Sequence, residues 1–128
     1  MRVLLDTQSY IWFVKGDERL SNIARNALGE SNVEKFISLG SVWEIAIKIS
    51  IGKLKLTQDL SSFISKHQIL NEIKILEINL SHFDKYIILP FHHRYPFYRL
   101  IISQALVDVI PIISSDNIFD RYGVNRIW

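Results

Sequence analysis

Short apolar runs alternate along this chain with longer segments in which apolar residues recur every three or four positions. The runs predict strands at residues 2–5, 33–38, 72–78, 109–113 and 125–127. The periodic segments between them predict helices, and Gly and Pro fall at plausible boundaries. Strands and helices in alternation are typical of a parallel sheet that is covered by helices on both faces. The pattern therefore predicts an α/β fold with three layers, α/β/α, around a central parallel sheet of four to five strands.

The most regular helical pattern lies in residues 41–51, which are followed by Gly52 as a stop signal. The residues that recur there at positions i, i+3, i+4, i+7 and i+8 are Trp43, Ala46, Ile47, Ser50 and Ile51. This spacing places them on one face of the helix, and an apolar face of this kind usually packs against a core. Trp43 is accordingly interpreted as a core residue.

The length and composition narrow the class of protein. At 128 residues we expect one domain, over residues 1–128, because the chain is too short for two. Its 48% hydrophobic and 12% aromatic residues exclude an intrinsically disordered chain. Without cysteine it has no disulfide bonds, thiolate metal site or cysteine nucleophile. With no signal-peptide pattern and no apolar run near the ~20 residues of a membrane span, we expect a cytoplasmic protein without a membrane partner.

Three acidic residues lie at or near the carboxyl ends of predicted strands. Asp6 follows the first strand, Glu44 lies early in the helix after the second, and Asp116 follows the strand at 109–113. Ligands of an open parallel sheet collect at this edge, and carboxylates that converge there suit Mg²⁺ or Mn²⁺. Such an ion activates water and stabilises charge on a phosphodiester. The acids also fit simpler roles, because the two aspartates are good helix N-caps and Glu44 forms an i,i+4 pair with Lys48.

Nucleotide-binding and receiver-like α/β domains also place acids at strand ends. A phosphate-binding loop is rich in glycine, whereas the chain after the first strand reads Asp6-Thr7-Gln8-Ser9. No Gly-x-Gly-x-x-Gly motif occurs in the sequence. We therefore set this class aside. A net charge of +2 does not by itself indicate a nucleic-acid binder either.

A series of short motifs follows in order over nearly the whole chain. The motifs are Leu4-Leu5-Asp6-Thr7, Ser41-Val42-Trp43-Glu44-Ile45-Ala46-Ile47-Lys48, Gly52-Lys53-Leu54, His92-His93-Arg94, Pro96-Phe97, Arg99-Leu100-Ile101, Gln104-Ala105, Ser115-Asp116, Phe119 and Tyr122-Gly123-Val124. In this order they resemble the VapC-like PIN-domain toxins, and the Trp-Glu-Ile-Ala-Ile-Lys run is the most specific part of the likeness. The resemblance implies a small α/β/α domain of the PIN type.

The resemblance also implies a function. Members of this family are Mg²⁺-dependent endoribonucleases, for which we expect single-stranded RNA as substrate. They are usually the toxin half of a toxin–antitoxin pair, they commonly form homodimers, and a short antitoxin protein binds them. Asp6, Glu44 and Asp116 match three of the family's catalytic and metal-binding acids, so the expected cofactor is Mg²⁺ or Mn²⁺.

The chain departs from the family pattern after His92-His93-Arg94. The family subtype reads Asp-Pro-Phe-Asp-Arg-Leu there, and this chain reads Tyr95-Pro96-Phe97-Tyr98-Arg99-Leu100. Tyrosine is a poor substitute for a metal-binding acid, because its phenol has a pKa of about 10 and is neutral near pH 7. With Pro96 at the first helical position, Tyr95 also replaces a good N-cap residue. We therefore expect a degenerate metal site at Tyr95 and Tyr98, with impaired activity.

Basic and aromatic residues around this motif suit contacts with RNA. The candidates for phosphate contacts are His92, His93, Arg94 and Arg99. Tyr95 and Tyr98 suit stacking on unpaired bases, and they equally suit a plug for the emptied metal pocket or a contact with a partner. Two functions stay open. One is a weakened Mg²⁺-dependent ribonuclease, and the other is an inactive PIN-fold protein that binds an antitoxin-like partner or RNA.

Overall fold

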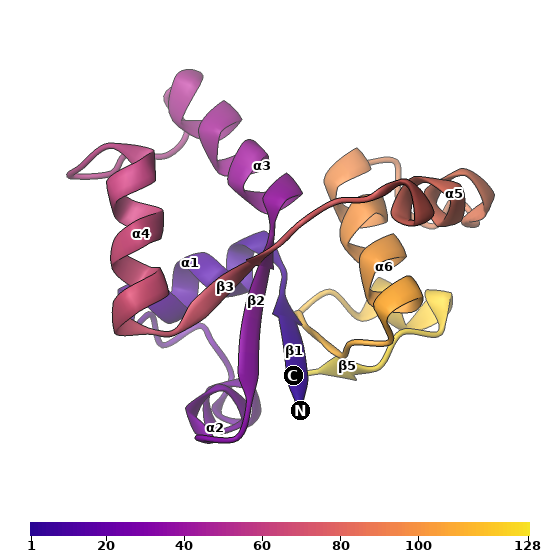
Figure 1. Cartoon of the computed structure of the whole chain (residues 1–128), viewed down its shortest axis with the longest axis horizontal. Coiled ribbons are helices and arrows are strands. Elements are labelled where there is room, and N and C mark those ends of the chain that lie inside the picture. The colour runs from indigo at the N-terminus through magenta and orange to yellow at the C-terminus, as the bar shows by residue number, and fades with distance from the viewer.

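A parallel sheet of five strands runs through the middle of the computed structural model, which describes all 128 residues (Figure 1). The elements in chain order are β1 (Arg2–Leu5), α1 (Thr7–Lys15), α2 (Asn22–Gly29), β2 (Glu34–Ser38), α3 (Leu39–Ser50), α4 (Leu60–Leu70), β3 (Ile73–Leu76), α5 (Leu80–Ile88), α6 (Pro96–Asp108), β4 (Ile112–Ile113), the 3₁₀ helix η1 (Asn117–Tyr122) and β5 (Arg126–Ile127). The strands lie in the order β3-β2-β1-β4-β5, and every neighbouring pair is parallel. The predicted α/β class and the parallel sheet are confirmed.

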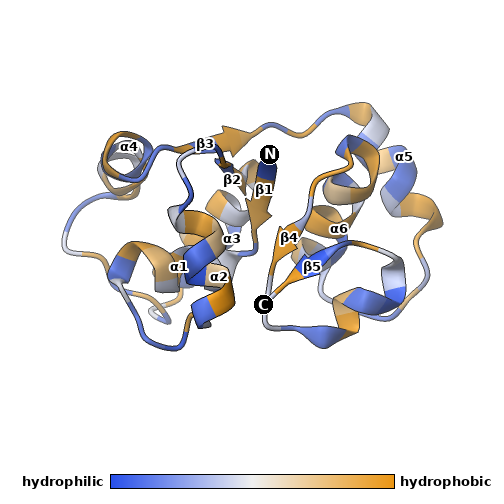
Figure 2. Ribbon diagram, turned by 90° about the horizontal axis from the view of Figure 1, so that it is seen from below, coloured by the Kyte–Doolittle hydropathy of each residue, from blue (hydrophilic) through white to orange (hydrophobic).

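The central strand β1 serves two separate hydrophobic cores. Val3 and Leu5 belong to a core of 14 buried residues that also draws on α1, α2, α3 and α4. Leu4 belongs to a second core of 9 buried residues, most of which come from α6, η1 and the segments beside them. Successive side chains of a strand point to opposite faces, so one short apolar run fills both cores. Figure 2 shows α1, α2 and α4 on one side of the sheet and α5 and α6 on the other, which is the predicted three-layer arrangement.

The strand order places the carboxyl ends of β1, β2 and β4 at one edge of the sheet. From β1 the chain builds outward to β2 and β3, and it then returns to the other side of β1 with β4 and β5. Ligands of open α/β sheets bind outside the strand ends at such a reversal. Asp6 follows β1, α3 begins directly after β2, and Ser114 follows β4. These three segments therefore carry the residues most relevant to function.

The sequence predicted that the apolar stripe of α3 packs against a core, and the structure shows that it does not. Trp43, Ile47 and Ile51 are 63%, 36% and 59% exposed, so the interpretation of Trp43 as a core residue is wrong. The buried residues of the helix are Gly40, Ser41, Glu44 and Ile45. This face is turned inward because α3 lies against α1 and α6, which bring polar partners for its polar residues. The stripe lies beside this inward face and stays largely exposed, and within the chain only the Trp43 ring has an aromatic contact, edge-on with Phe97 at 5.2 Å.

Several elements are shorter than the sequence predicted. β4 spans only Ile112–Ile113, because Val109 adopts a left-handed conformation with φ 55° and ends α6. That conformation is incompatible with an extended strand, so the predicted strand at 109–113 loses its first residues. β3 and β5 are also shorter than the predicted strands at 72–78 and 125–127. No helix has the combination of length and apolar character that crossing a membrane requires.

Candidate functional site

Three carboxylates gather where the strands end, and each comes from a different segment. Asp6 caps α1, with Oδ1 accepting the Ser9 backbone N–H at 2.8 Å. Asp116 caps η1, with Oδ1 accepting the Ile118 backbone N–H at 3.0 Å. Glu44 lies on the inward face of α3 and is buried. The capping role that the sequence allowed for the two aspartates is therefore present, and it fixes both of them at this edge of the sheet. We call these three acids the acidic centre.

Electrostatic effects place the three acids in one neighbourhood. Burial raises the pKa of Asp6 above its usual value, a hydrogen bond with Ser114 acts in the opposite direction, and the charge of Glu44 adds a smaller rise. Burial also raises the pKa of Tyr98, and the charges of all three acids add to that rise. The Tyr98 hydroxyl thus lies within electrostatic reach of Asp6, Glu44 and Asp116.

Glu44 is bound on both of its carboxylate oxygens. Thr7 Oγ1 donates a hydrogen bond to Oε1 at 2.6 Å, and the Tyr95 hydroxyl donates one to Oε2 at 3.0 Å. Lys48 Nζ lies 3.4 Å from the same Oε2, as expected for an i,i+4 pair. The pair is not the solvated surface pair that its spacing allowed, because the Glu44 side chain is only 3% exposed. A buried carboxylate requires partners of this kind, since removing its charge from water is costly.

Asp116 is bound by His93, which lies between it and Tyr122. His93 Nε2 lies 2.7 Å from Asp116 Oδ2, and His93 Nδ1 lies 3.0 Å from the Tyr122 hydroxyl. An ionised Asp116 can only accept, so His93 Nε2 carries the hydrogen of this bond. The imidazole is nearly buried and packs edge-on against the rings of Tyr98 and Phe119. His93 thus faces the acidic centre and not the solvent.

The two tyrosines that replace the family's acids turn toward the same acids. Tyr95 occupies the N-cap position of α6 but makes no capping hydrogen bond, because its hydroxyl reaches Glu44 instead. Burial raises the pKa of Tyr95 to about 12, and the neighbouring charge of Glu44 contributes. Tyr98 packs edge-on against Tyr95, with ring centroids 5.1 Å apart, and against Phe119 at 5.6 Å. Both phenols therefore stay neutral, and together they close the acidic centre with aromatic rings.

The four basic residues that the sequence assigned to RNA take different positions. Arg99 is only 2% exposed, and its guanidinium donates to the carbonyls of Tyr86, Leu89 and Pro90 at the end of α5. The expected phosphate contact of Arg99 is thus corrected, because its side chain is committed to the protein interior. His93 is committed to Asp116, as described above. His92 and Arg94 are exposed and remain available beside the acidic centre.

This arrangement does not fit a divalent cation. Mg²⁺ takes oxygen ligands at about 2.0–2.1 Å in an octahedral shell and keeps several waters, so it requires free oxygens around an open space. No group of three or more acidic or histidine side chains is placed to hold a metal ion. Glu44 and Asp116 instead bind Thr7, Tyr95 and His93. These side chains occupy the oxygens that a cation would need.

Sequence reasoning missed three residues that complete the site. Thr7 donates a hydrogen bond to Glu44, Ser114 Oγ accepts one from the Asp116 backbone N–H, and Tyr122 supports His93. Thr7 directly follows Asp6 in the motif at the end of the first strand, and that position was a usable signal. Tyr122 lies in the resembled motif Tyr122-Gly123-Val124, whereas Ser114 carried no such signal.

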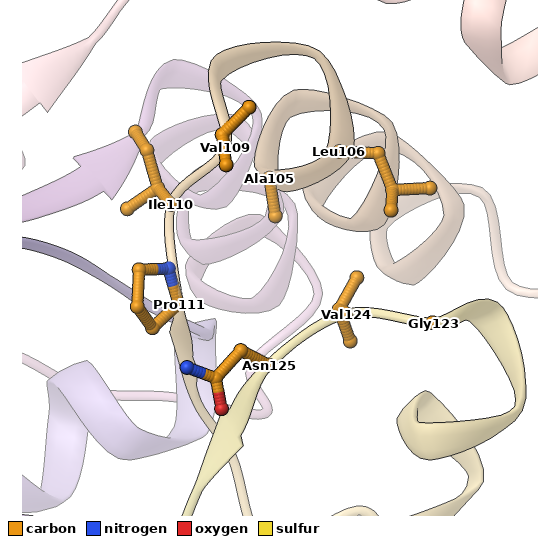
Figure 3. A pocket seen from close by; sticks show the side chains of 8 residues that line it. All are labelled: Ala105, Leu106, Val109, Ile110, Pro111, Gly123, Val124 and Asn125. Atoms are coloured by element: carbon orange, nitrogen blue, oxygen red, sulfur yellow. The ribbon is translucent and has the colours of Figure 1, made fainter.

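A separate pocket of about 290 Å³ lies at the opposite edge of the sheet (Figure 3). It is lined by the end of α6, the loop that leads to β4 and the residues before β5. Asn125 supplies the only polar side chain, and none of the eight lining residues is ionisable. The pocket therefore lacks the groups that catalysis requires, and it is distinct from the acidic centre.

Comparisons with known proteins agree with the α/β fold. Residues 3–125 match the sequence model of the PIN domain. The solved structure of VapBC2 from Rickettsia felis bound to a promoter DNA fragment superposes with a TM-score of 0.69 at 15% identity, covering 100% of both chains. VapBC-1 from nontypeable Haemophilus influenzae gives 0.64 at 19% identity, covering 98% of this chain and 96% of that one. FitAB bound to the IR36 DNA fragment gives 0.66 at 16%, covering 97% and 92%. No curated protein sequence matches significantly, and identities this low show the fold alone.

Proposed function

Because this chain belongs to the PIN-domain family, we propose that it is the toxin-type component of a toxin–antitoxin pair, in which Mg²⁺-dependent endoribonuclease activity is impaired. Full-length superposition on VapBC and FitAB structures supports the toxin-type assignment. The observation that carries the impairment is the hydrogen bond from the Tyr95 hydroxyl to Glu44, made from a position where the resembled family has an acid. Any residual cleavage of single-stranded RNA is expected to depend on Mg²⁺ or Mn²⁺ and on Asp6, Glu44 and Asp116.

A second candidate function follows from the same contact. Since Tyr95 and His93 bind two of the three acids, the protein also suits a role as an inactive PIN-fold protein that binds an antitoxin-like partner or RNA. Exposed His92 and Arg94 supply hydrogen-bond donors for phosphate contacts, and the partly exposed Tyr95 ring supplies a surface for base stacking. Both candidates share the antitoxin partner and differ only in cleavage. We place both in the cytoplasm, where RNA is accessible.

Binding of an antitoxin is the first expected result. We expect the product of a small reading frame next to this gene to co-purify with the chain when the two are expressed together and one carries an affinity tag. A tagged copy of the partner should retain the chain on an affinity resin, and an unrelated tagged protein should not. Absence of binding between the two purified proteins in calorimetry would count against both candidate functions.

Two exposed apolar stripes favour a homodimer. On α3 the stripe comprises Trp43, Ile47 and Ile51, and on α5 the exposed apolar positions are Leu80, Phe83 and Ile87. Both helices pack against α6, so the stripes flank the same element. Groups of exposed apolar side chains often mark interaction sites. We propose that a second copy of the chain covers it.

Single lysine substitutions test this interface. Ile51→Lys and Ile87→Lys should convert the dimer to a monomer, because each buries an ammonium group in the contact, and light scattering after size exclusion measures the mass. Ile69→Lys is the matched control, since Ile69 is 78% exposed on α4 and lies outside both stripes. All three substitutions lie near a helix C-terminus, where a cation is tolerated. A monomeric wild-type chain, or equal loss of the dimer in the control, would contradict the assignment.

A further inference from the structure

We propose that Lys48, His93, Tyr95 and Tyr98 act as a built-in substitute for the divalent cation, so that the acidic centre is complete without Mg²⁺ or Mn²⁺ and does not bind them. This inference rests on the proposed function, because it concerns the same acidic centre. It goes further in assigning to Lys48 the role of neutralising Glu44, and to His93, Tyr95 and Tyr98 that of binding the acids and filling the site. Three independent contacts carry it.

The first contact is the pairing of Glu44. Its Oε1 is engaged by Thr7, and its Oε2 is shared between the Tyr95 hydroxyl at 3.0 Å and Lys48 Nζ at 3.4 Å. A metal ion that used Oε2 would have to displace the Tyr95 hydrogen bond. It would also have to approach the positive charge of Lys48, which repels a cation in a weakly screened, buried setting. Glu44 is therefore neutralised from within its own helix.

The second contact is the clamp on Asp116. Oδ1 accepts the Ile118 backbone N–H at 3.0 Å, and Oδ2 lies 2.7 Å from His93 Nε2. His93 cannot easily swing away, because the Tyr122 hydroxyl holds its other nitrogen and the Tyr122 ring stacks on it at 5.6 Å. Freeing Asp116 for a metal ion would require this packed cluster to rearrange.

The third contact is the position of Tyr98 among the acids. Its ring packs edge-on against His93 at 5.2 Å and against Tyr95 at 5.1 Å. Tyr98 therefore connects the residue that binds Asp116 with the residue that binds Glu44. The rise in its pKa has burial as the first cause and the charges of Asp6, Glu44 and Asp116 as the others, which agrees with a hydroxyl directed into the centre. A phenol brings volume and a donor but no negative charge, and its ring takes the space of a hydrated ion.

Thermal unfolding and Mn²⁺ calorimetry test the proposal directly. We expect the melting temperature of the wild-type chain to be the same, within about 1 °C, in EDTA and in millimolar Mn²⁺, because a ligand that does not bind cannot stabilise. Tyr95→Asp/Tyr98→Asp should gain a rise of about 5 °C or more in Mn²⁺ together with a measurable heat of binding. Tyr95→Asn/Tyr98→Asn is the matched control, since it opens the same space without adding charge, and it should gain little.

The outcomes separate this inference from the proposed function. Stabilisation of the wild-type chain by Mn²⁺ that is lost on Asp6→Asn would overturn the inference, and this measurement needs no folded double variant. No gain in a folded aspartate variant would also overturn it, because replacing both rings by carboxylates would then fail to open the site to the ion. If the metal result stands while the antitoxin fails to bind, only the proposed function is lost.

Discussion

Tyr95→Asp/Tyr98→Asp should cleave single-stranded RNA at least about 100-fold faster than the wild-type chain in Mg²⁺, which is the largest change in activity that we expect. The substitution removes the hydroxyl that engages Glu44 and the ring that lies among the three acids. It also restores carboxylates at the two positions where the resembled family has them. A labelled RNA without secondary structure, followed over time on a gel, gives the rate.

The asparagine double variant is the control for this rate as well. It has nearly the same shape as the aspartate variant and lacks only the charge, so its rate should remain near that of the wild-type chain. EDTA and Asp6→Ala should each abolish the gain, and the substitution excludes a contaminating nuclease, whose activity would not depend on Asp6. If the aspartate variant binds Mn²⁺ but cuts no faster, the acidic centre has been wrongly identified as the catalytic one.

The fold was predictable because its signals are local. Val3, Leu4 and Leu5 form an unbroken apolar run, and a strand that is covered on both faces has that composition. The alternation of such runs with helical segments then implies a parallel sheet. End positions such as Val109 were not predictable, because the left-handed turn that ends α6 depends on how the chain packs there and not on residue type.

The orientation of α3 shows what periodicity leaves out. The spacing of Trp43, Ile47 and Ile51 predicts that they share a face of the helix. It does not predict whether another element covers that face. The buried face is selected by partners that are distant in sequence, since Thr7 and Tyr95 lie 37 and 51 residues from Glu44. A polar face that finds such partners can be buried while an apolar face stays exposed.

The acidic centre was predictable as a set of residues but not as a network. Strand-end position and the family resemblance pointed to Asp6, Glu44 and Asp116, and the charges of all three raise the pKa of Tyr98. The pairing of His93 with Asp116 depends on the loop before α6, which carries no periodic pattern. Basic residues in that loop were therefore assigned to RNA as a group, although only some of them face outward.

Arg99 illustrates this error, and its replacement should cause the largest loss of stability that we expect. Its guanidinium donates to the carbonyls of Tyr86, Leu89 and Pro90 at 3.1, 3.4 and 2.9 Å. These are among the last carbonyls of α5 and the residues after it, where the helix carries partial negative charge. The same group lies 4.1 Å from the centre of the Phe91 ring. Arg99 thus ties the end of α5 to α6.

Arg99→Ala should lower the free energy of unfolding by about 3 kcal/mol, because it leaves buried carbonyls without donors and opens a cavity between the helices. We expect the melting temperature to fall by about 10 °C in thermal unfolding followed by circular dichroism. Arg99→Lys retains the charge but fewer donors, so it should recover about half of the loss. Arg99→Met retains most of the packing without the charge. If the methionine variant is as stable as the wild-type chain, packing and not hydrogen bonding holds α5 in place, and the Arg99 side chain has no special role at this helix end.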